Sequence, residues 1–303
     1  MQNINEENNF RNSVGLIIVN YNDSIRTLNL VKNVINFPTI KNVIIVNNNS
    51  SDDSLEHLQL YSNDKYVICN STKNGGYGYG NNIGIKKANE LSCEFVLICN
   101  PDIIFSEATL LSMLNTISSD DKCAIVNAKE TYLGNFAWKY TNGFNDVMTA
   151  SILYNKLFSK RYYEKSYFEH KEVAKVDIIQ GSFLLVPTKL MINFGMYDED
   201  FFLYEEEKIL YKKFIDKGFH SLTDLKVNYE HHHIDSKHNT LNSYLKSKKN
   251  LLDSKYKFVE RYRRFNSIEL FLTRCFFKLT MVEMYLYGLF LVKIKKRKNN
   301  ERE

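Results

Sequence analysis

The 303-residue sequence has little proline and glycine, and its cysteines form no recognisable pattern. Only 3 Pro and 12 Gly are present, which argues against long disordered linkers. The five cysteines are an odd number without metal-site spacing, and Cys69, Cys99 and Cys123 lie in apolar runs. We therefore expect reduced, buried thiols. The N-terminus lacks the basic and apolar regions of a secretory signal, so a cytoplasmic protein is expected.

The remaining composition is that of an ordinary globular protein. Hydrophobic residues make up 44% of the chain and charged residues 25%, enough for a sizeable core in one large domain with or without an appendage. The formal charge of +5 is modest, and its one concentrated block is the run 293–298. Because nucleic-acid binding would rest on that block alone, no nucleic-acid partner is expected.

Short apolar runs alternate with helical stretches from Val14 onward. The runs are rich in β-branched residues, as expected of strands that are buried on both faces. Repeated strand–helix units of this length predict a parallel sheet covered by helices. The first four strands are expected at 14–19, 43–46, 66–69 and 95–99.

Asn-rich segments follow three of these strands: Asn20-Tyr21-Asn22, Asn47-Asn48-Asn49 and Asn100-Pro101-Asp102. Ligands bind at the C-terminal ends of parallel strands, so the three segments are expected along one ligand-binding edge. A cation that bridges two phosphates needs one or two carboxylate oxygens, which Asp102 would supply. A simple Asn-Pro-Asp turn is the alternative interpretation.

The segment from Asn74 to Gly84 is glycine-rich. Glycines permit tight turns and close approach to a ligand, and the amides of the next helix can face an anion. The spacing of Gly78, Gly80 and Gly84 departs from the dinucleotide-binding fingerprint, and the segment follows the third strand instead of the first. Both features argue against a dinucleotide-dependent oxidoreductase.

Two further clusters carry candidate catalytic and metal-binding side chains. Glu205, Glu206 and Glu207 follow an aromatic segment, where a carboxylate suits a general base for an acceptor hydroxyl. An interaction with the helix dipole is the alternative explanation. A neutral imidazole from His231-His232-His233 would complete a metal shell, and an exposed strand end is the alternative there.

Taken in order, these segments resemble the family 2 glycosyltransferases of the GT-A fold, especially the bacterial rhamnosyltransferase-like branch, from about Val14 to Ser236. The resemblance implies a GT-A-type, Rossmann-like, mostly parallel sheet flanked by helices. It also implies inverting transfer of a sugar from a nucleoside diphosphate donor, with Mg²⁺ or Mn²⁺ as cofactor. The matching segments are 19–22, 47–52, 74–84, 100–102, 180–182 and 195–207.

The resemblance implies a role for each matching residue. Val19, Asn20 and Tyr21 correspond to the base-contacting end of the first strand, and Asn47 replaces an Asp that usually accepts a hydrogen bond from the base. Asp102 matches the metal-binding carboxylate of the DXD-type motif. The other residues implied at the donor site are Asn49, Asn74, Gly75, Gly76, Asn82 and Asn100.

Glu207 matches the family's catalytic Asp, and Glu206 is the alternative base. Ile209 and Lys213 stand where Asp and Arg are common. These departures support a second interpretation, a non-catalytic nucleotide-sugar-binding subunit of a glycan assembly complex.

The segment 271–294 predicts a helix with an apolar stripe, and the charged residues Glu269, Arg274, Lys278 and Glu283 lie off that stripe. Each charge would cost about 2.5–3.5 kcal/mol near the bilayer centre, which disfavours a simple membrane span. The helix is expected to lie on the inner membrane surface, or to pack on the catalytic domain or on a second subunit of a homodimer. The stripe comprises Phe271, Leu272, Cys275, Leu279, Val282, Leu286, Leu289 and Phe290.

The predicted organisation is a polar tail (1–13), a catalytic domain (14–236) and a helical, membrane-associated extension (237–303). Within the catalytic domain, a nucleotide-binding half spans about 14–128 and an acceptor half about 129–236. Rhamnose is the first expectation for the donor sugar. The expected acceptor is a saccharide or a lipid-linked glycan in O-antigen or capsule synthesis, at the inner face of the cell membrane.

Overall fold

The computed structural model describes residues 9–131, 136–158, 161–232 and 240–300, with side chains described up to Leu291. Two compact units divide the chain. The sheet unit contains 1–140, 162–202 and 206–232, and the helical unit contains 141–161, 203–205 and 233–303. The C-terminal helices thus group with residues 141–161, which lie within the span predicted as the catalytic domain.

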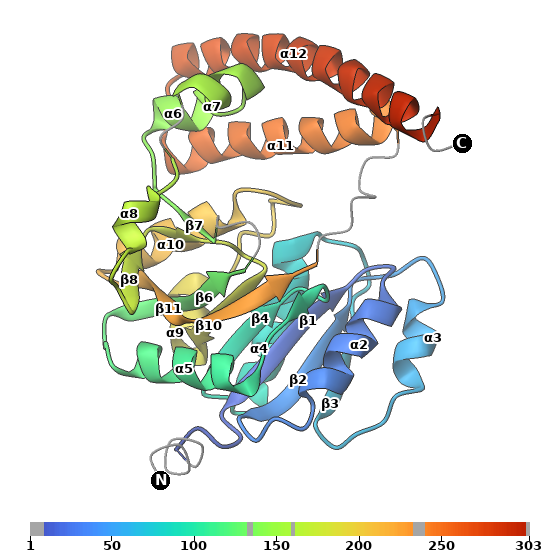
Figure 1. Cartoon of the computed structure of the whole chain (residues 1–303), viewed down its shortest axis with the longest axis vertical. Helices are drawn as coiled ribbons and strands as arrows, with labels where there is room; N and C mark the ends of the chain where they lie inside the picture. The colour runs from blue at the N-terminus through green and yellow to red at the C-terminus, as the bar shows by residue number, and fades with distance from the viewer. Residues whose placement is uncertain (1–8, 132–135, 159–160, 233–239, 301–303) are drawn as a thin grey trace. The chain divides into compact units, whose positions relative to one another are not determined.

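The sheet unit is built on a nine-stranded, mostly parallel sheet (Figure 1). The predicted fold class is confirmed. Strands β1, β2, β3 and β4 are parallel to one another, β10 runs antiparallel between β4 and β6, and β6 is parallel to β11. The order is β3 (Tyr66–Asn70), β2 (Ile40–Asn47), β1 (Val14–Asn20), β4 (Phe95–Cys99), β10 (Phe183–Pro187), β6 (Cys123–Glu130), β11 (His220–His231) and β5 (Ile103–Ile104), with β8 (Val173–Val176) paired to β11.

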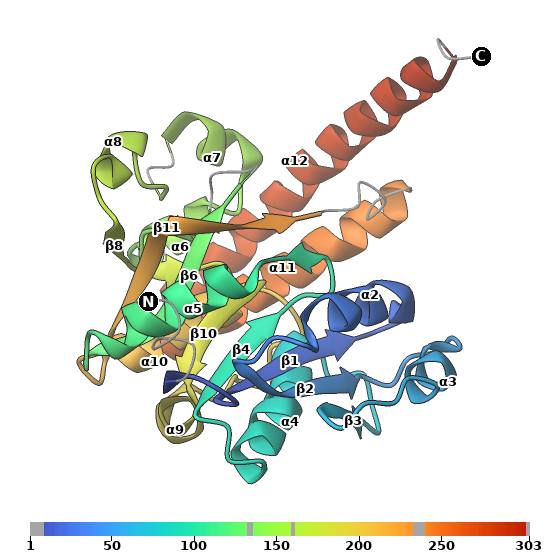
Figure 2. The same cartoon turned by 60° about the horizontal axis from the view of Figure 1, so that its bottom comes forward.

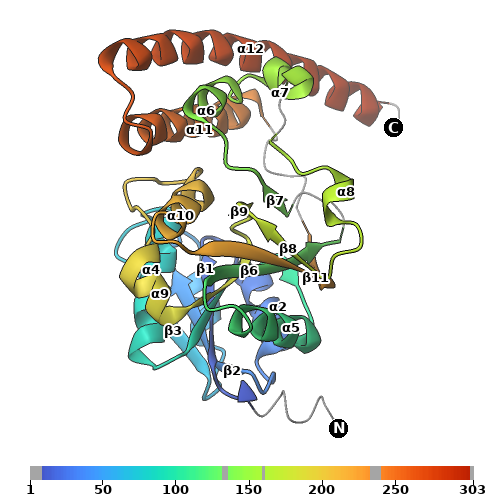
Figure 3. The same ribbon diagram turned by 90° about the vertical axis from the view of Figure 1, so that its left-hand side faces the viewer.

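Helices cover both faces of this sheet (Figure 3). Successive side chains of a strand point to opposite faces, so Leu16 and Ile18 join one core cluster while Ile17 joins the other. The first cluster receives α2 (Ser24–Val34), α3 (Ser54–Gln59) and α5 (Glu107–Ser118). The second receives α4 (Tyr77–Glu90), the short α9 (Thr188–Leu190) with η1 (Met191–Gly195), and α10 (Glu206–Ile215). Figure 2 shows α2 and α4 on opposite sides of β1 and β2.

Phe214 secures α10 in the second cluster and is 1% exposed. Replacing it by alanine is expected to destabilise the chain by about 3–5 kcal/mol, because the lost contacts leave a cavity. Urea unfolding followed by circular dichroism measures this change. Ile215→Ala, at a neighbouring position that is 38% exposed, is the matched control and should shift the midpoint far less. Equal shifts would contradict the assigned core.

Residues 136–158 and 161–175 contribute to both units. In the sheet unit, β7 (Ala137–Trp138) pairs with β9 (Ile178–Ile179), and α8 (Lys165–Phe168) precedes β8. The apolar run 176–186 forms parts of three strands, because the turn Gln180–Ser182 separates β9 from β10. That turn becomes central to the candidate site.

The helical unit contains α6 (Gly143–Met148), α7 (Ile152–Phe158), α11 (Leu241–Tyr262) and α12 (Ser267–Asn300), and α11 and α12 pack side by side (Figure 1). Small residues allow the close approach: a side chain at Gly288 would meet Leu241 at 2.6 Å. The buried face of α12 is Thr273, Phe277, Thr280, Met284 and Gly288.

The predicted apolar stripe of α12 lies on the opposite, exposed face. Leu279 is 69% exposed and Phe271 is 65% exposed. Within the described part of the helical unit, the stripe is therefore left uncovered. In the described part of the chain, no helix is both long and apolar enough to cross a membrane.

Candidate functional site

The sheet register brings the first two Asn-rich segments together. Asn20 ends β1 opposite Asn47, and Asn47 lies opposite Asn70 at the end of β3. Asn20 and Asn47, which the sequence predicts at the base site, are both buried and form hydrogen bonds with the loop after β2. Asn20 Nδ2 donates to Ser50 Oγ at 3.1 Å, and Asn47 Oδ1 accepts from the Ser50 backbone amide at 3.4 Å. These amides therefore shape the edge on which the first and second strands end.

The exposed residues of this edge include Tyr21 and Asn49. Tyr21 is 46% exposed. Asn49 is exposed and has a positive φ of 55° at the tip of the loop after β2. Val19 instead packs beneath α4, where a side chain at Gly80 would meet its Cγ1 at 2.8 Å. Tyr21 and Asn49 are therefore accessible at this edge, whereas Asn20 is buried.

Asn48 is a structural residue of this edge that was not singled out from the sequence. Its backbone amide donates to the Asn20 carbonyl at 2.9 Å. Its buried side chain donates to Asn74 Oδ1 at 3.1 Å and to the Gly76 carbonyl at 3.0 Å. Asn48 thus ties the β2 loop to the glycine-rich segment. The sequence feature that could have identified Asn48 is its position as the middle one of three consecutive asparagines.

The glycine-rich segment serves close packing within the protein. Gly76 has a φ of 92°, and a Cβ there would collide with the Phe202 carbonyl. The Tyr77 amide at the start of α4 donates to the same carbonyl at 3.0 Å, so this amide faces protein, whereas the sequence suggested an anion. A side chain at Gly75 would meet the Tyr79 ring.

Asn82 is buried on α4, and both the nitrogen and the oxygen of its side-chain amide form hydrogen bonds within the protein. Its Nδ2 donates to the Tyr197 carbonyl at 3.0 Å and to Glu199 Oε1 at 2.9 Å. Its Oδ1 accepts from the Tyr197 amide at 2.9 Å. Asn82 therefore orders residues 197–199, and any effect it has on a donor passes through that loop.

The candidate metal corner joins Asp102 to His231. The antiparallel pairing of β5 and β11 places His231 opposite Ile103, which puts its imidazole beside Asp102. His231 Nε2 lies 3.2 Å from Asp102 Oδ1, and the two side chains are only 4% and 10% exposed. His232 turns away and pairs with Glu230 Oε2 at 2.8 Å. His233 lies outside the described residues.

Asp102 offers the oxygen ligand that a small, hard divalent cation prefers. The 3.2 Å between His231 Nε2 and Asp102 Oδ1 is the distance of an ion pair or hydrogen bond between the two side chains. Among the described residues, no group of three or more His, Cys, Asp or Glu side chains is placed to hold a metal. A cation here would therefore need further oxygens, which the phosphates of a nucleotide provide.

The turn Gln180–Ser182 connects the metal corner to the acids. Gln180 Nε2 lies 3.4 Å from His231 Nδ1, and the Ser182 carbonyl accepts from the Asn100 amide at 2.8 Å. Between them, the Gly181 amide donates to Glu207 Oε1 at 3.3 Å. The Tyr77 hydroxyl donates to the Gly181 carbonyl at 2.6 Å and holds this turn from the α4 side. Gln180, Gly181 and Ser182 thus contact His231, Glu207 and Asn100, respectively. All three contacted residues were predicted for the site.

The two candidate bases differ in accessibility. Glu206 is buried, whereas Glu207 is half-buried and is oriented by Gly181. Burial first, and then the charges of Glu207 and Glu206, raise the pKa of Tyr197 well above its ordinary value, so this phenol stays neutral beside the acids. Because a base must reach an acceptor hydroxyl, Glu207 is the better placed of the two.

The departures from the family pattern at 209 and 213 have structural explanations. Ile209 is 2% exposed and packs in the interior, on the buried side of α10. Lys213 donates to the Met196 carbonyl, and burial lowers its pKa. Lys213 therefore anchors the loop before the acids, a role that an Arg at this position would also fill.

Residues 203–205 belong to the helical unit and contact α11 within it. The Ser254 hydroxyl donates to the Leu203 carbonyl at 2.7 Å, and Lys255 Nζ lies 3.3 Å from Glu205 Oε1. Tyr204 and Glu205 have φ values of 77° and 70°. Such strained backbone persists where its surroundings fix it, and it clusters at functional sites.

Gly181→Ala tests the geometry of the turn. An added Cβ would lie 3.0 Å from Glu207 Oε1 and would displace the carboxylate while leaving the sheet intact. The carboxylate has to shift by a few tenths of an ångström. Because a displacement of about 1 Å can cost about a hundredfold in rate, we expect this smaller shift to lower kcat by up to about tenfold with an unchanged melting temperature. Gly218→Ala, at a solvent-exposed turn with open space around it, is the control for glycine replacement, although its positive φ predicts a small loss of stability.

Comparison with known proteins identifies the family. The family model described as "Glycosyl transferase family 2" matches residues 16–176, more than half of the chain. The chain belongs to this family. The match begins in β1 and contains the Asn-rich edge, the glycine-rich segment and Asp102.

One curated relative is the low-salt glycan biosynthesis hexosyltransferase Agl10 of Haloferax volcanii. It is 28% identical over 196 residues, which cover 64% of this chain and 59% of the relative. This family 2 chain thus spans less than two thirds of the length of the curated relative that it matches.

Two solved structures share the GT-A fold. GalNAc-T7, solved with UDP, GalNAc and Mn²⁺, matches with a TM-score of 0.57 at 14% identity, over 82% of this chain and 50% of that one. The mannosyltransferase PcManGT of Pyrobaculum calidifontis, solved with GDP-Man and Mn²⁺, matches with a TM-score of 0.55 at 12% identity, over 93% and 75% of the two chains. At these identities the likeness establishes the fold.

Proposed function

We propose that this chain is an inverting, metal-dependent glycosyltransferase that moves a sugar from a nucleoside diphosphate donor to a hydroxyl of a glycan acceptor. The observation that carries the proposal is the single turn, Gln180–Ser182, that contacts both the Asp102–His231 corner and the Glu207 carboxylate. Such a displacement requires a site for the donor diphosphate and a base that can reach the acceptor hydroxyl. In this proposal the turn holds both in place.

Glu207 serves as the general base. It accepts the proton of the acceptor hydroxyl as that oxygen forms a bond to the anomeric carbon of the donor sugar. The bond between the anomeric carbon and the diphosphate oxygen breaks with its electron pair going to the diphosphate. One displacement of this kind inverts the anomeric configuration. The Gly181 amide donates to Glu207 Oε1 and so fixes the orientation of the carboxylate.

Asp102 and His231 would hold Mg²⁺ or Mn²⁺ with the diphosphate of the donor. The ion, when bound, neutralises the charge that develops on the departing nucleoside diphosphate. The base of the donor is proposed to contact Tyr21 and Asn49, which are exposed, next to the buried Asn20 and Asn47. In PcManGT and GalNAc-T7 a nucleotide and Mn²⁺ are bound to the same fold, which supports this assignment.

The substrates proposed are rhamnose as the first choice of donor sugar and a saccharide or lipid-linked glycan as acceptor. The hexosyltransferase relative acts in glycan biosynthesis, which supports a role in making a cell-surface polysaccharide such as O-antigen or capsule. The exposed apolar stripe of α12 supports a location at the inner face of the cell membrane.

A non-catalytic nucleotide-sugar-binding subunit is the second candidate. It is favoured by Ile209, which places an aliphatic side chain where the family commonly has an acid. The two candidates share donor binding and differ in turnover, so release of the nucleoside diphosphate from a bound donor separates them.

A thermal-shift panel of nucleotide sugars, with and without Mn²⁺, tests the proposal. One donor is expected to raise the melting temperature in the presence of Mn²⁺, and deoxythymidine-diphosphate rhamnose is the first to try. Release of nucleoside diphosphate from that donor then establishes turnover. A flat panel across all donors would count against both candidates, and stabilisation without release would leave only the binding subunit.

A further inference from the structure

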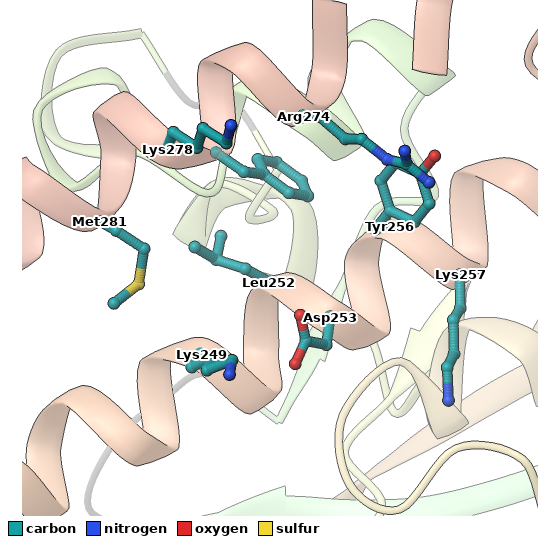
Figure 4. Close-up of a pocket in the computed structure, with 9 residues that line it drawn as sticks. Lys249, Leu252, Asp253, Tyr256, Lys257, Arg274, Lys278 and Met281 are labelled. Carbon is teal, nitrogen blue, oxygen red and sulfur yellow. The ribbon is translucent and has the colours of Figure 1, made fainter. Parts of the chain in front are cut away.

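A cavity of about 630 Å³ lies between α11 and α12, within the helical unit (Figure 4). Its floor is apolar, formed by the buried Leu252 and Phe277 and the half-buried Met281. The volume is in the range of about 300–1,000 Å³ that is typical of ligand pockets. The residues proposed for sugar transfer belong to the sheet unit and do not line this cavity.

The lining carries four cations and one acid. Lys249 and Lys257 come from α11, Arg274 and Lys278 from α12, and Asp253 is the acid. The Arg274 guanidinium lies over the Tyr256 ring, 4.8 Å from its centroid, which orients this cation at the cavity (Figure 4). Positive charge around an apolar floor suits a ligand with an anionic group and an apolar body.

The exposed apolar face of α12 runs alongside these cations. Leu279 and Leu286 are 69% and 60% exposed, and Lys278 lies next to Leu279 at the edge of the stripe. On the other flank, the Leu153 amide of α7 donates to Glu283 Oε1 at 2.6 Å. Leu153 and Leu157 of α7 are both 61% exposed, so α7 extends the apolar face of α12.

We infer that the α11–α12 cavity binds the phosphate-bearing headgroup of an anionic lipid while the exposed face of α12 and α7 lies on the acyl chains of the bilayer. This rests on the membrane-surface part of the proposed function and assigns it a site. An apolar stripe flanked by Lys and Arg is the pattern of helices that lie in the membrane interface. A second copy of the chain suits this surface less well, since Lys is depleted from protein–protein interfaces.

Vesicle co-sedimentation of the full chain, without nucleotide sugar, tests the inference. The chain is expected to bind vesicles of phosphatidylcholine with phosphatidylglycerol far better than phosphatidylcholine alone. Each cation near an anionic surface contributes about fivefold, so Arg274→Gln with Lys278→Gln should lower the partition coefficient by about thirtyfold. Leu279→Ser with Leu286→Ser should also lower it, by removing apolar area.

The matched control is Lys32→Gln with Lys86→Gln, which removes the same charge from exposed positions on α2 and α4. This pair should leave vesicle binding unchanged. Equal losses from the two cation pairs would overturn the inference, because attraction by net charge would then explain the binding. Circular dichroism and melting temperature establish that each variant is folded.

Two other occupants would also overturn the inference. A dimer that forms without vesicles and dissociates on Leu279→Ser with Leu286→Ser, in a chain that binds no vesicles, would assign the apolar face to a second copy. Stabilisation by inorganic phosphate that requires Arg274 and Lys278, again without vesicle binding, would assign the cavity to a free anion. Donor-dependent thermal stabilisation, measured on the same variants, reports on the proposed function separately and should be unaffected.

Discussion

Glu207→Gln is expected to lower kcat for sugar transfer by about a hundred- to ten-thousand-fold, the usual contribution of a general base. Glutamine keeps the length of the side chain and can still accept the Gly181 amide bond, so the local geometry should survive. It cannot take the proton of the acceptor hydroxyl. Because donor binding does not require this proton transfer, the KM for donor and the donor-dependent thermal shift should stay unchanged.

Glu206→Gln is the matched control for this prediction. Glu206 precedes Glu207 and is buried, so it should affect stability more than the chemical step. Initial rates of nucleoside diphosphate release, at saturating donor and acceptor, measure both variants. If Glu206→Gln abolishes transfer while Glu207→Gln retains it, the base is Glu206 and the role assigned to the Gly181 contact is wrong.

The fold was predictable because its signals are local. Continuous apolar runs mark β1, β2, β3 and β4, and the order of strands and helices implies a parallel sheet. The antiparallel position of β10 between β4 and β6 was not predictable in this way. It depends on pairing between residues that lie far apart in the sequence, and an apolar run does not specify its partner strand.

The sequence predicted which segments form the candidate site, but it did not predict which of their residues contact one another. Asp102 and His231 were both named from the sequence, but only the pairing of β5 with β11 selects His231 over His232. Likewise, the hydrogen bonds of the Asn82 side chain could not be predicted, because they depend on the position of the loop 197–199. Motif matching assigns a residue to the site, whereas its hydrogen-bond partners determine whether it faces ligand or protein.

The apolar stripe of α12 shows a similar limit. The sequence identified most of its residues, because helical periodicity depends only on spacing, although Ile268 and Leu291 are also exposed on α12. It could not tell whether the stripe is buried, since the face that packs on α11 is made of small and mixed residues such as Thr273, Thr280 and Gly288. Close packing of two helices favours small residues, so the more apolar face is the one left exposed.

Asp102→Asn is expected to lower the rate of transfer by at least about a hundredfold, comparable to the loss of one preorganised charge-stabilising group. Asparagine preserves shape and one carbonyl oxygen but removes the negative charge that a divalent cation requires. The Mn²⁺-dependent part of the thermal shift by nucleoside diphosphate should disappear with it, and EDTA should have the same effect on the wild-type chain. This second readout does not depend on turnover.

His231→Gln and Glu230→Gln complete this test, since the two residues are adjacent and only His231 contacts Asp102. Mn²⁺ titration of the thermal shift should require more metal in His231→Gln, because one nitrogen ligand is lost, and should be unchanged in Glu230→Gln. A normal Mn²⁺ response in Asp102→Asn would place the cation elsewhere. A normal response in His231→Gln alone would instead assign the imidazole to holding Asp102 and Gln180 in place, 3.2 Å and 3.4 Å from its two nitrogens.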